Sequence, residues 1–159
     1  MVAQAHRAFA TRPHTEQPMK THGPTPFDAA AVAPPAGSYS HAVSAAGDLE
    51  WLHLSGQIGR SADGSIPSTI DAQAHQLWTN VLAILASRGM TPRHIVKITN
   101  YLVSRADFPS YRSAREAALS GHRPASTLLY VAGLVSPDVL AEVDVVAAAP
   151  RAGASGEAR

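Results

Sequence analysis

The spacing of apolar residues predicts two helices in the middle of the chain. The clearer one covers residues 68–89, where apolar side chains recur every three or four positions. These positions are Ala74, Leu77, Val81, Ile84 and Leu85. Ser68 or Thr69 can cap the start of this helix, and Gly89 suits the position just after its end. A second helix is predicted over residues 108–119.

Strand patterns surround these helices. Residues 39–57 contain two strand-like runs on either side of Gly47 and Asp48, which predicts a hairpin. Residues 94–103 alternate apolar and polar side chains, as a strand with one face in the core does. In residues 126–132 both alternating sets are apolar, so this strand should be covered on both sides.

The last strand pattern, in residues 140–148, bears on assembly. Val143 and Val145 form an apolar set, whereas Glu142 and Asp144 point together to the opposite face. Two helices can cover only one face of such a sheet. The other face needs a partner, which another copy of the chain can supply. We therefore expect a homo-oligomer with carboxylates at the subunit interface.

Composition and charge are typical of one cytoplasmic domain. The 159 residues are 45% apolar and 16% charged, and the chain has no cysteine. We expect a flexible N-terminal extension over residues 1–32, a domain over 33–150 and a flexible tail over 151–159. A transit peptide is the alternative interpretation of the basic, acid-poor extension. The net charge of +1 and the lack of a Lys/Arg cluster argue against nucleic acid, and no apolar run is long enough to cross a membrane.

Six segments, in this order and spacing, resemble the Rid (RidA/YjgF) family of reactive-intermediate imine and enamine deaminases. They are APPAGSYSHAV, LHLSGQIG, TIDAQAHQLWTNVLAIL, HIVKITNYLVSRADFPSY, HRPASTLLYVAGL and AEVDVVAA, within residues 33–148. The resemblance implies an α+β, chorismate-mutase-like subunit with a mixed sheet and two helices on one face. It also implies a homotrimer whose sheets form a central barrel, with pockets between neighbouring subunits.

The resemblance also assigns roles to individual residues. It implies that Tyr39 lies in the pocket and that Glu142 positions or deprotonates the attacking water, with Asp144 beside it. Ser55 and Gly56 match the pocket wall, where a glycine lets backbone groups approach a ligand. Three of these residues have a structural alternative. Tyr39 could be a tyrosine that packs at the start of a strand, and Gly56 could be a glycine in a strand bulge. Glu142 could be a carboxylate that only forms hydrogen bonds or ion pairs between subunits.

One position departs from the family pattern. The family has a strand arginine that grips the substrate carboxylate, and this chain has Ser126 there. The neighbouring Arg123 belongs to the variable start of the motif. Arg112 falls in the second predicted helix where family members commonly carry a pocket asparagine, so it could supply part of an anion grip. A solvated helix arginine is the alternative interpretation of Arg112.

Two functions of different class follow. In the first, the chain is a Rid-like hydrolase for an imine or enamine other than the usual small 2-imino acids, because Ser126 replaces the arginine. In the second, it is a non-catalytic trimeric protein that binds a small metabolite.

The eight histidines have no metal-ligand spacing, and there is no phosphate-binding glycine loop. We expect neither a metal nor a cofactor.

Overall fold

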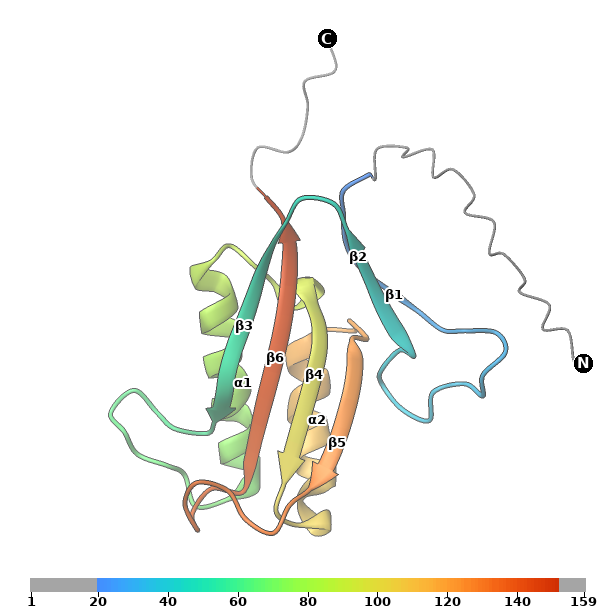
Figure 1. Cartoon of the computed structure of the whole chain (residues 1–159). Coiled ribbons are helices and arrows are strands. Elements are labelled where there is room, and N and C mark those ends of the chain that lie inside the picture. Colours follow the sequence, from blue (N-terminus) through green and yellow to red (C-terminus); the bar gives the residue numbers. More distant parts are fainter. Residues whose placement is uncertain (1–19, 152–159) are drawn as a thin grey trace, which may run out of the picture.

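The computed structural model describes residues 20–151 and has two separate sheets with two helices (Figure 1). A four-stranded sheet has the order β3-β6-β4-β5, and β1 pairs with β2 in a two-stranded sheet. The strands are β1 (His22–Phe27), β2 (Ala42–Ala46), β3 (Leu49–Ile58), β4 (Ile95–Leu102), β5 (Ala125–Tyr130) and β6 (Ala141–Pro150). The helices are α1 (Ile70–Ser87) and α2 (Phe108–Leu119), with short 3-10 turns at Pro92–His94 and Arg105–Asp107.

Both helices lie on the same face of the four-stranded sheet (Figure 1). In that sheet β6 is antiparallel to β3 and β4, whereas β4 and β5 are parallel. The mixed sheet and its two helices confirm the predicted α+β class. The trimeric barrel stays a prediction. Within the described residues, neither helix is long and apolar enough to cross a bilayer.

Local capping explains why α1 begins and ends where the sequence predicts. The Thr69 side chain accepts a hydrogen bond from the Ala72 N–H at the N-terminus. At the C-terminus Gly89 has φ +66°, a conformation that costs glycine little. The N–H groups of Gly89 and Met90 donate to the carbonyls of Ala86 and Leu85, which completes a Schellman motif.

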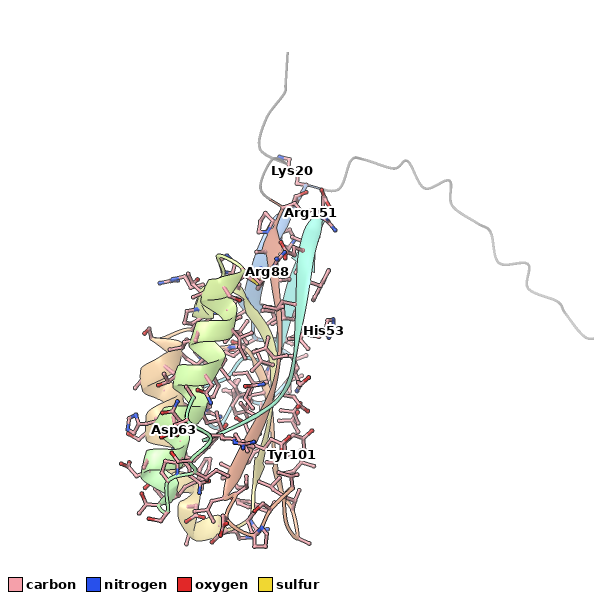
Figure 2. All side chains as sticks on the ribbon, turned by 90° about the vertical axis from the view of Figure 1, so that its left-hand side faces the viewer. Lys20, His53, Asp63, Arg88, Tyr101 and Arg151 are labelled. Carbon is pink, nitrogen blue, oxygen red and sulfur yellow. The ribbon has the colours of Figure 1, made fainter. Side chains whose placement is uncertain are left out.

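The core lies between the helices and the inward face of the sheet. Val143 and Val145 of β6 are buried there, as their alternation predicts, and Leu77 of α1 packs in the same cluster. The opposite face carries no helix, and we call it the open face. Figure 2 shows His53 on this side, pointing away from the helices. Trp51 and Leu129 are 50% and 42% exposed. Within one chain, therefore, β5 is not covered on both sides.

The predicted hairpin around Gly47 is wrong, although both of its strands exist. β2 pairs with β1, and β3 pairs with β6. Gly47 turns the chain between the two sheets with φ +91°, and the Asp48 N–H donates to Thr21 Oγ1 at 3.2 Å. A Cβ on Gly47 would overlap Thr21, so this turn also depends on close packing of the chain that leads into β1.

The strand β1 lies inside the segment that we predicted to be a flexible extension. Residues 22–27 pair with residues 42–46, so ordered structure begins before residue 33. Pro24 and Pro26 interrupt the strand pattern in the sequence, because proline lacks the N–H that a ladder uses. The predictions for residues 1–19 and 152–159 lie outside the described residues.

A buried polar network ties α2 to the sheet. Tyr111 donates a hydrogen bond to Asn100 Oδ1 at 2.6 Å, and both residues are fully buried. Asn100 Nδ2 in turn donates to the Thr127 carbonyl at 2.6 Å and to Ser126 Oγ at 3.0 Å. Burial raises the pKa of Tyr111, so its hydroxyl stays protonated and remains a donor. The network connects α2, β4 and β5.

We predict that Tyr111→Phe lowers the free energy of unfolding by about 1–3 kcal/mol, since it leaves a buried amide oxygen without its donor. Urea denaturation would measure the change. Tyr130→Phe is the matched control, because no hydrogen bond of the Tyr130 hydroxyl occurs among residues 20–151, and it should change stability by less than about 0.5 kcal/mol. Equal losses in the two variants would contradict the role of the network.

Candidate functional site

The seven residues predicted for the site fall into two groups on opposite faces of the sheet. Ser126 pairs in register with Ile98, which is buried on the helix face. Glu142 pairs with Tyr101, one of the alternate residues of β4 that face away from the helices. Tyr39 and Arg112 lie with Ser126, whereas Ser55, Gly56 and Asp144 belong with Glu142. A single chain does not bring all seven into one pocket.

The first group lines a cavity of about 300 Å³, which we call the helix-side pocket. It lies between α2, β5 and the loop that leads to β2. Its lining residues are Ala36, Gly37, Ser38, Tyr39, Phe108, Arg112, Arg115, Ser126 and Leu128. The wall therefore combines apolar side chains with two arginines, a tyrosine and serine hydroxyls. Such a mixture suits a small ligand that has one charged end.

Ser126 is half-buried in this pocket and accepts the hydrogen bond from Asn100. A neutral hydroxyl offers neither the positive charge nor the paired donors of an arginine. Asn100 was not among the predicted site residues, although a polar residue between Ile98 and Leu102 on the apolar side of a strand is a visible signal. The amide orients the Ser126 side chain and is itself held by Tyr111.

Arg112 is at the rim of the pocket, and a carboxylate already binds it. Its side chain is 46% exposed, and Nε donates to Glu116 Oε1 at 2.7 Å. Ser38 Oγ donates to the same oxygen at 2.6 Å. The hydrogen bonds from Ser38 and Arg112 lower the pKa of Glu116, so this carboxylate stays ionised. The predicted anion grip of Arg112 stays a prediction, and the ion pair competes with it.

Arg115 is a charged lining residue that was not among the predicted site residues. Its side chain is buried, with 5% exposure, and its Nε has no hydrogen-bond partner. Burial, and to a smaller degree the charge of Arg112, lower its pKa, whereas Tyr111 and Glu116 act in the opposite direction. Helical spacing could have found it, because position 115 is four residues from both Tyr111 and Leu119 on the buried face of α2.

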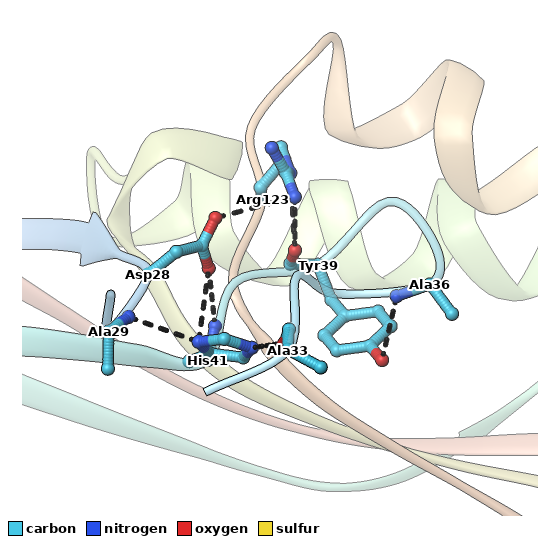
Figure 3. A network of polar contacts seen from close by, with 7 residues as sticks. All are labelled: Asp28, Ala29, Ala33, Ala36, Tyr39, His41 and Arg123. Atoms are coloured by element: carbon cyan, nitrogen blue, oxygen red, sulfur yellow. Dashed lines mark hydrogen bonds and ion pairs between the residues drawn. The ribbon is translucent and has the colours of Figure 1, made fainter. Parts of the chain in front are cut away.

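A network of polar contacts holds Tyr39 at the mouth of the pocket (Figure 3). The Tyr39 hydroxyl accepts a hydrogen bond from the Ala36 N–H at 3.3 Å. Its carbonyl accepts two hydrogen bonds from Arg123, at 2.7 and 3.2 Å, and Arg123 lies 3.7 Å from Asp28. Arg123 therefore points at the backbone of this loop, and among the described residues it is not part of the helix-side pocket.

His41 closes the same loop (Figure 3). Its Nδ1 accepts a hydrogen bond from the Ala29 N–H at 3.1 Å, and its Nε2 contacts the Ala33 carbonyl at 2.8 Å. In this pattern Nδ1 acts as the acceptor and Nε2 as the donor. The same Nδ1 lies 4.0 Å from the Asp28 carboxylate. Asp28 instead accepts the His41 backbone N–H at 2.8 Å.

The second group surrounds Glu142 on the open face. A Cβ on Gly56 would overlap Glu142 Oε1, so the absence of a side chain at Gly56 makes room for the carboxylate. The register of β3 shifts between Leu54 and Gln57, which places Ser55 and Gly56 in a bulge. Gln57 Nε2 donates to the Ser55 carbonyl at 2.9 Å and supports this bulge.

Asp144 is next to Glu142 on the same face, as the alternation predicts. The Tyr101 hydroxyl donates to Asp144 Oδ2 at 2.9 Å, which raises the pKa of Tyr101. Burial and the negative charge of Asp144 raise the pKa of Glu142. A carboxylate with a raised pKa is a better base than an ordinary one and can also hold a proton nearer neutrality. The arrangement is therefore suited to proton transfer.

Glu142→Gln should increase the stability of the protein near pH 7. The raised pKa means that the folded state favours the protonated carboxyl, so the ionised form carries a cost that is present above the folded-state pKa. That cost disappears as the pH falls below the ordinary value of 4.5. Urea denaturation from pH 8 to pH 4 should show a gain for the variant that shrinks with pH.

The matched control for this measurement is Asp48→Asn, which removes an exposed carboxylate paired with Arg151. It should give no gain in stability at any pH. A loss of stability in Glu142→Gln at pH 7 would mean that the carboxylate stabilises the fold, and would contradict this account of its surroundings.

Gly56→Ala and Gly59→Ala should both lower stability, but by different amounts. The methyl group at residue 56 would meet the mobile end of Glu142, so we expect a folded protein, with stability lowered by less than about 1 kcal/mol and a displaced carboxylate. At residue 59 it would lie 2.5 Å from the Gln73 carbonyl and 2.6 Å from its Cα, which cannot move without α1. Gly59→Ala should therefore lose about 1–3 kcal/mol.

Thermal denaturation of the two glycine variants, with a crystal structure of Gly56→Ala, would check both expectations. An unchanged position of Glu142 in that crystal structure would contradict the close packing described for the open face.

Known proteins with similar sequences and structures cover nearly all of the described residues. A family model described as Endoribonuclease L-PSP matches residues 30–149. Protein MMF1, mitochondrial, of Saccharomyces cerevisiae is 31% identical over 77% of this chain and 83% of its own length. The 2-iminobutanoate/2-iminopropanoate deaminase of Escherichia coli is 34% identical over 58% of this chain and 75% of its own.

A solved structure shows the same fold. The Rid family protein YyfB of Yersinia pestis superposes with a TM-score of 0.71 at 26% identity, over 79% of this chain and 98% of that protein. With the family model spanning most of the sequence and these relatives in agreement, the chain belongs to the Rid (YjgF/L-PSP) family.

Proposed function

We propose that this protein is a Rid-like hydrolase that deaminates an imine or enamine bulkier than the usual small 2-imino acids. The observation that carries the proposal is the Glu142 carboxylate. It lies in the gap left by Gly56, beside Asp144, and its pKa is raised. A relative whose printed name is that of an imine deaminase supports the same reaction class.

The reaction needs a base that takes one proton from water. As the water oxygen bonds to the imine carbon, the π electrons of the C=N bond move to nitrogen, and Glu142 accepts the water proton. Glu142 returns this proton to the nitrogen, which gives an intermediate with a hydroxyl and an amino group on one carbon. Glu142 then takes the hydroxyl proton and passes it to the amino nitrogen, so that the carbonyl forms as the C–N bond breaks and ammonia leaves. An enamine first takes a proton on carbon and loses one from nitrogen, and so becomes the imine. The balance is imine plus water to ketone plus ammonia.

The helix-side pocket supports a substrate with an apolar part. Its volume of about 300 Å³ is larger than a three-carbon imino acid requires, and Phe108 and Leu128 line it. Ser126 provides room where the family has an arginine. Without that arginine, a small substrate held only by its carboxylate would bind poorly, since a bidentate guanidinium contact is much stronger than a hydroxyl contact.

The proposal includes a homotrimer with its active sites between subunits. Within one chain, Glu142 and Ser126 lie on opposite faces of the sheet, so a neighbouring copy would have to bring the two kinds of residue together. Trp51 and Leu129 make the open face partly apolar. Covering that face with other copies would remove these side chains from water. Sedimentation equilibrium should show three times the subunit mass of 16.6 kDa, and a monomer would contradict the proposed trimer.

The second candidate is a trimeric protein that binds a small metabolite without turnover. The same separation of Glu142 from the helix-side pocket favours it, because binding in the pocket requires no base. Ser126 also favours it, since the arginine that the family uses is lost. The two candidates differ in whether ammonia is released, and they share the pocket and its ligand.

We do not propose RNA cleavage, although the matching family model carries the word endoribonuclease. A net charge of +1 and no run of basic residues give little attraction for a phosphate backbone.

A cytoplasmic location is part of our proposal. The yeast relative is named as mitochondrial, and that word describes the relative.

Ammonia release from freshly generated imines tests the proposed function. An amino acid oxidase can supply 2-iminopropanoate from alanine and the bulkier aromatic imine from phenylalanine. We expect the protein to accelerate hydrolysis of the bulkier imine above its spontaneous rate and to act weakly on the small one. Glu142→Gln should reduce the rate about 100-fold or more, because it removes the base.

Ser126→Arg is the complementary variant and should gain activity on 2-iminopropanoate. Full activity of Glu142→Gln would remove this residue from the mechanism. If the unmodified protein accelerates neither reaction, the hydrolase proposal fails and the binding protein is favoured.

A further inference from the structure

Arg115 is a buried cation without a protein partner. Its side chain is 5% exposed and its Nε makes no hydrogen bond. Nor does an ion pair or another hydrogen bond of this guanidinium occur within residues 20–151. Glu116 follows it in the chain, but Glu116 Oε1 accepts hydrogen bonds from Ser38 and Arg112 instead. The Tyr111 hydroxyl is similarly used by Asn100.

Burial of such a group is costly. Water solvates a guanidinium well, and a protein interior replaces that solvation only if other groups pair with the charge. The desolvation lowers the pKa of Arg115, and the nearby charge of Arg112 lowers it further. An anion placed against the guanidinium would offset both effects. A buried arginine that lines a cavity is therefore suited to an anionic ligand.

The surroundings indicate what that anion is. Arg115 lines the helix-side pocket together with Arg112, and Phe108 and Leu128 supply apolar wall. A planar carboxylate matches the two parallel N–H groups of a guanidinium. The apolar wall suits a carbon chain or ring attached to the carboxylate. Inorganic phosphate has no apolar part, and it would leave Phe108 and Leu128 without a contact.

We propose that Arg115 binds the carboxylate of a small organic acid in the helix-side pocket, and that Arg112 assists from the rim. The apolar part of the ligand contacts Phe108 and Leu128. The identity of this ligand as a 2-imino acid substrate rests on the proposed function, whereas carboxylate binding does not. Arg115 thereby supplies from α2 the positive charge that Ser126 of β5 cannot supply.

Calorimetry on the full chain tests the proposal without any turnover. The probes are phenylpyruvate, pyruvate, the uncharged phenylacetone and inorganic phosphate. We expect phenylpyruvate to bind at least about 10-fold more tightly than each of the others, because it alone has both the carboxylate and the ring. Arg115→Met should weaken phenylpyruvate binding about 10-fold or more and leave phenylacetone binding unchanged.

The stability of the ligand-free variant provides a second readout. Arg115→Met replaces a buried unpaired charge by an apolar side chain of similar length, so its thermal midpoint should equal or exceed that of the unmodified protein. A residue with a purely structural role would instead lower the midpoint. Arg93→Met is the matched control at an exposed arginine outside the pocket, and it should change neither binding nor the midpoint.

Arg115→Lys keeps the positive charge but loses the paired N–H donors of the guanidinium. It replaces Arg115→Met in the binding measurement if the methionine variant does not fold. It should bind phenylpyruvate more weakly than the unmodified protein and more tightly than any variant without the charge. Unchanged phenylpyruvate affinity in Arg115→Met, or in the lysine variant when methionine fails, would overturn the proposal. The proposal would also be overturned if phosphate bound as tightly as phenylpyruvate, or if neither phenylpyruvate nor pyruvate bound.

The two proposals can fail separately. If no imine is hydrolysed and phenylpyruvate binding still depends on Arg115, the hydrolase proposal fails and the carboxylate site stands. If the bulky imine is hydrolysed and Arg115→Met leaves both KM and phenylpyruvate affinity unchanged, the hydrolase stands and the carboxylate site fails.

Discussion

The alternation along β6 is the constraint on which the core and the open-face part of the candidate site depend. This strand lies between β3 and β4, so its inward residues have no access to water and must be apolar. Val143 and Val145 meet that requirement. The intervening Glu142 and Asp144 are then forced onto the open face together, where burial and the charge of Asp144 raise the pKa of Glu142. The core and the carboxylate pair are two results of one pattern.

The helix-side pocket depends on a different interaction, the hydrogen bonding of Asn100. This fully buried amide receives the Tyr111 hydroxyl from α2 and donates to Ser126 on β5. It therefore fixes the distance between the helix and the edge strand. The pocket lies in the space between those two elements. Arg115, one turn after Tyr111, occupies that space in consequence, and its unpaired charge is best explained by ligand binding and not by stability.

The sequence predicted the two helices well because their signals are local. Thr69 and Gly89 act within one turn of the ends of α1. The hairpin prediction was wrong because strand pairing is not local. β2 and β3 are adjacent in sequence, but β2 pairs with β1 and β3 pairs with β6. The strand β1 was missed because its prolines weaken the strand pattern, and pairing with β2 compensates for that weakness.

The sequence by itself determined which residues share a face, since the periods of helices and strands are properties of the local backbone. It therefore placed Glu142 beside Asp144. The tertiary structure alone decided what surrounds Glu116 and Arg115. Glu116 pairs with Arg112 within α2 and also accepts a hydrogen bond from Ser38, whereas docking against the sheet buries Arg115. Ser38 and the sheet are distant from α2 in sequence, so no local pattern encodes these contacts.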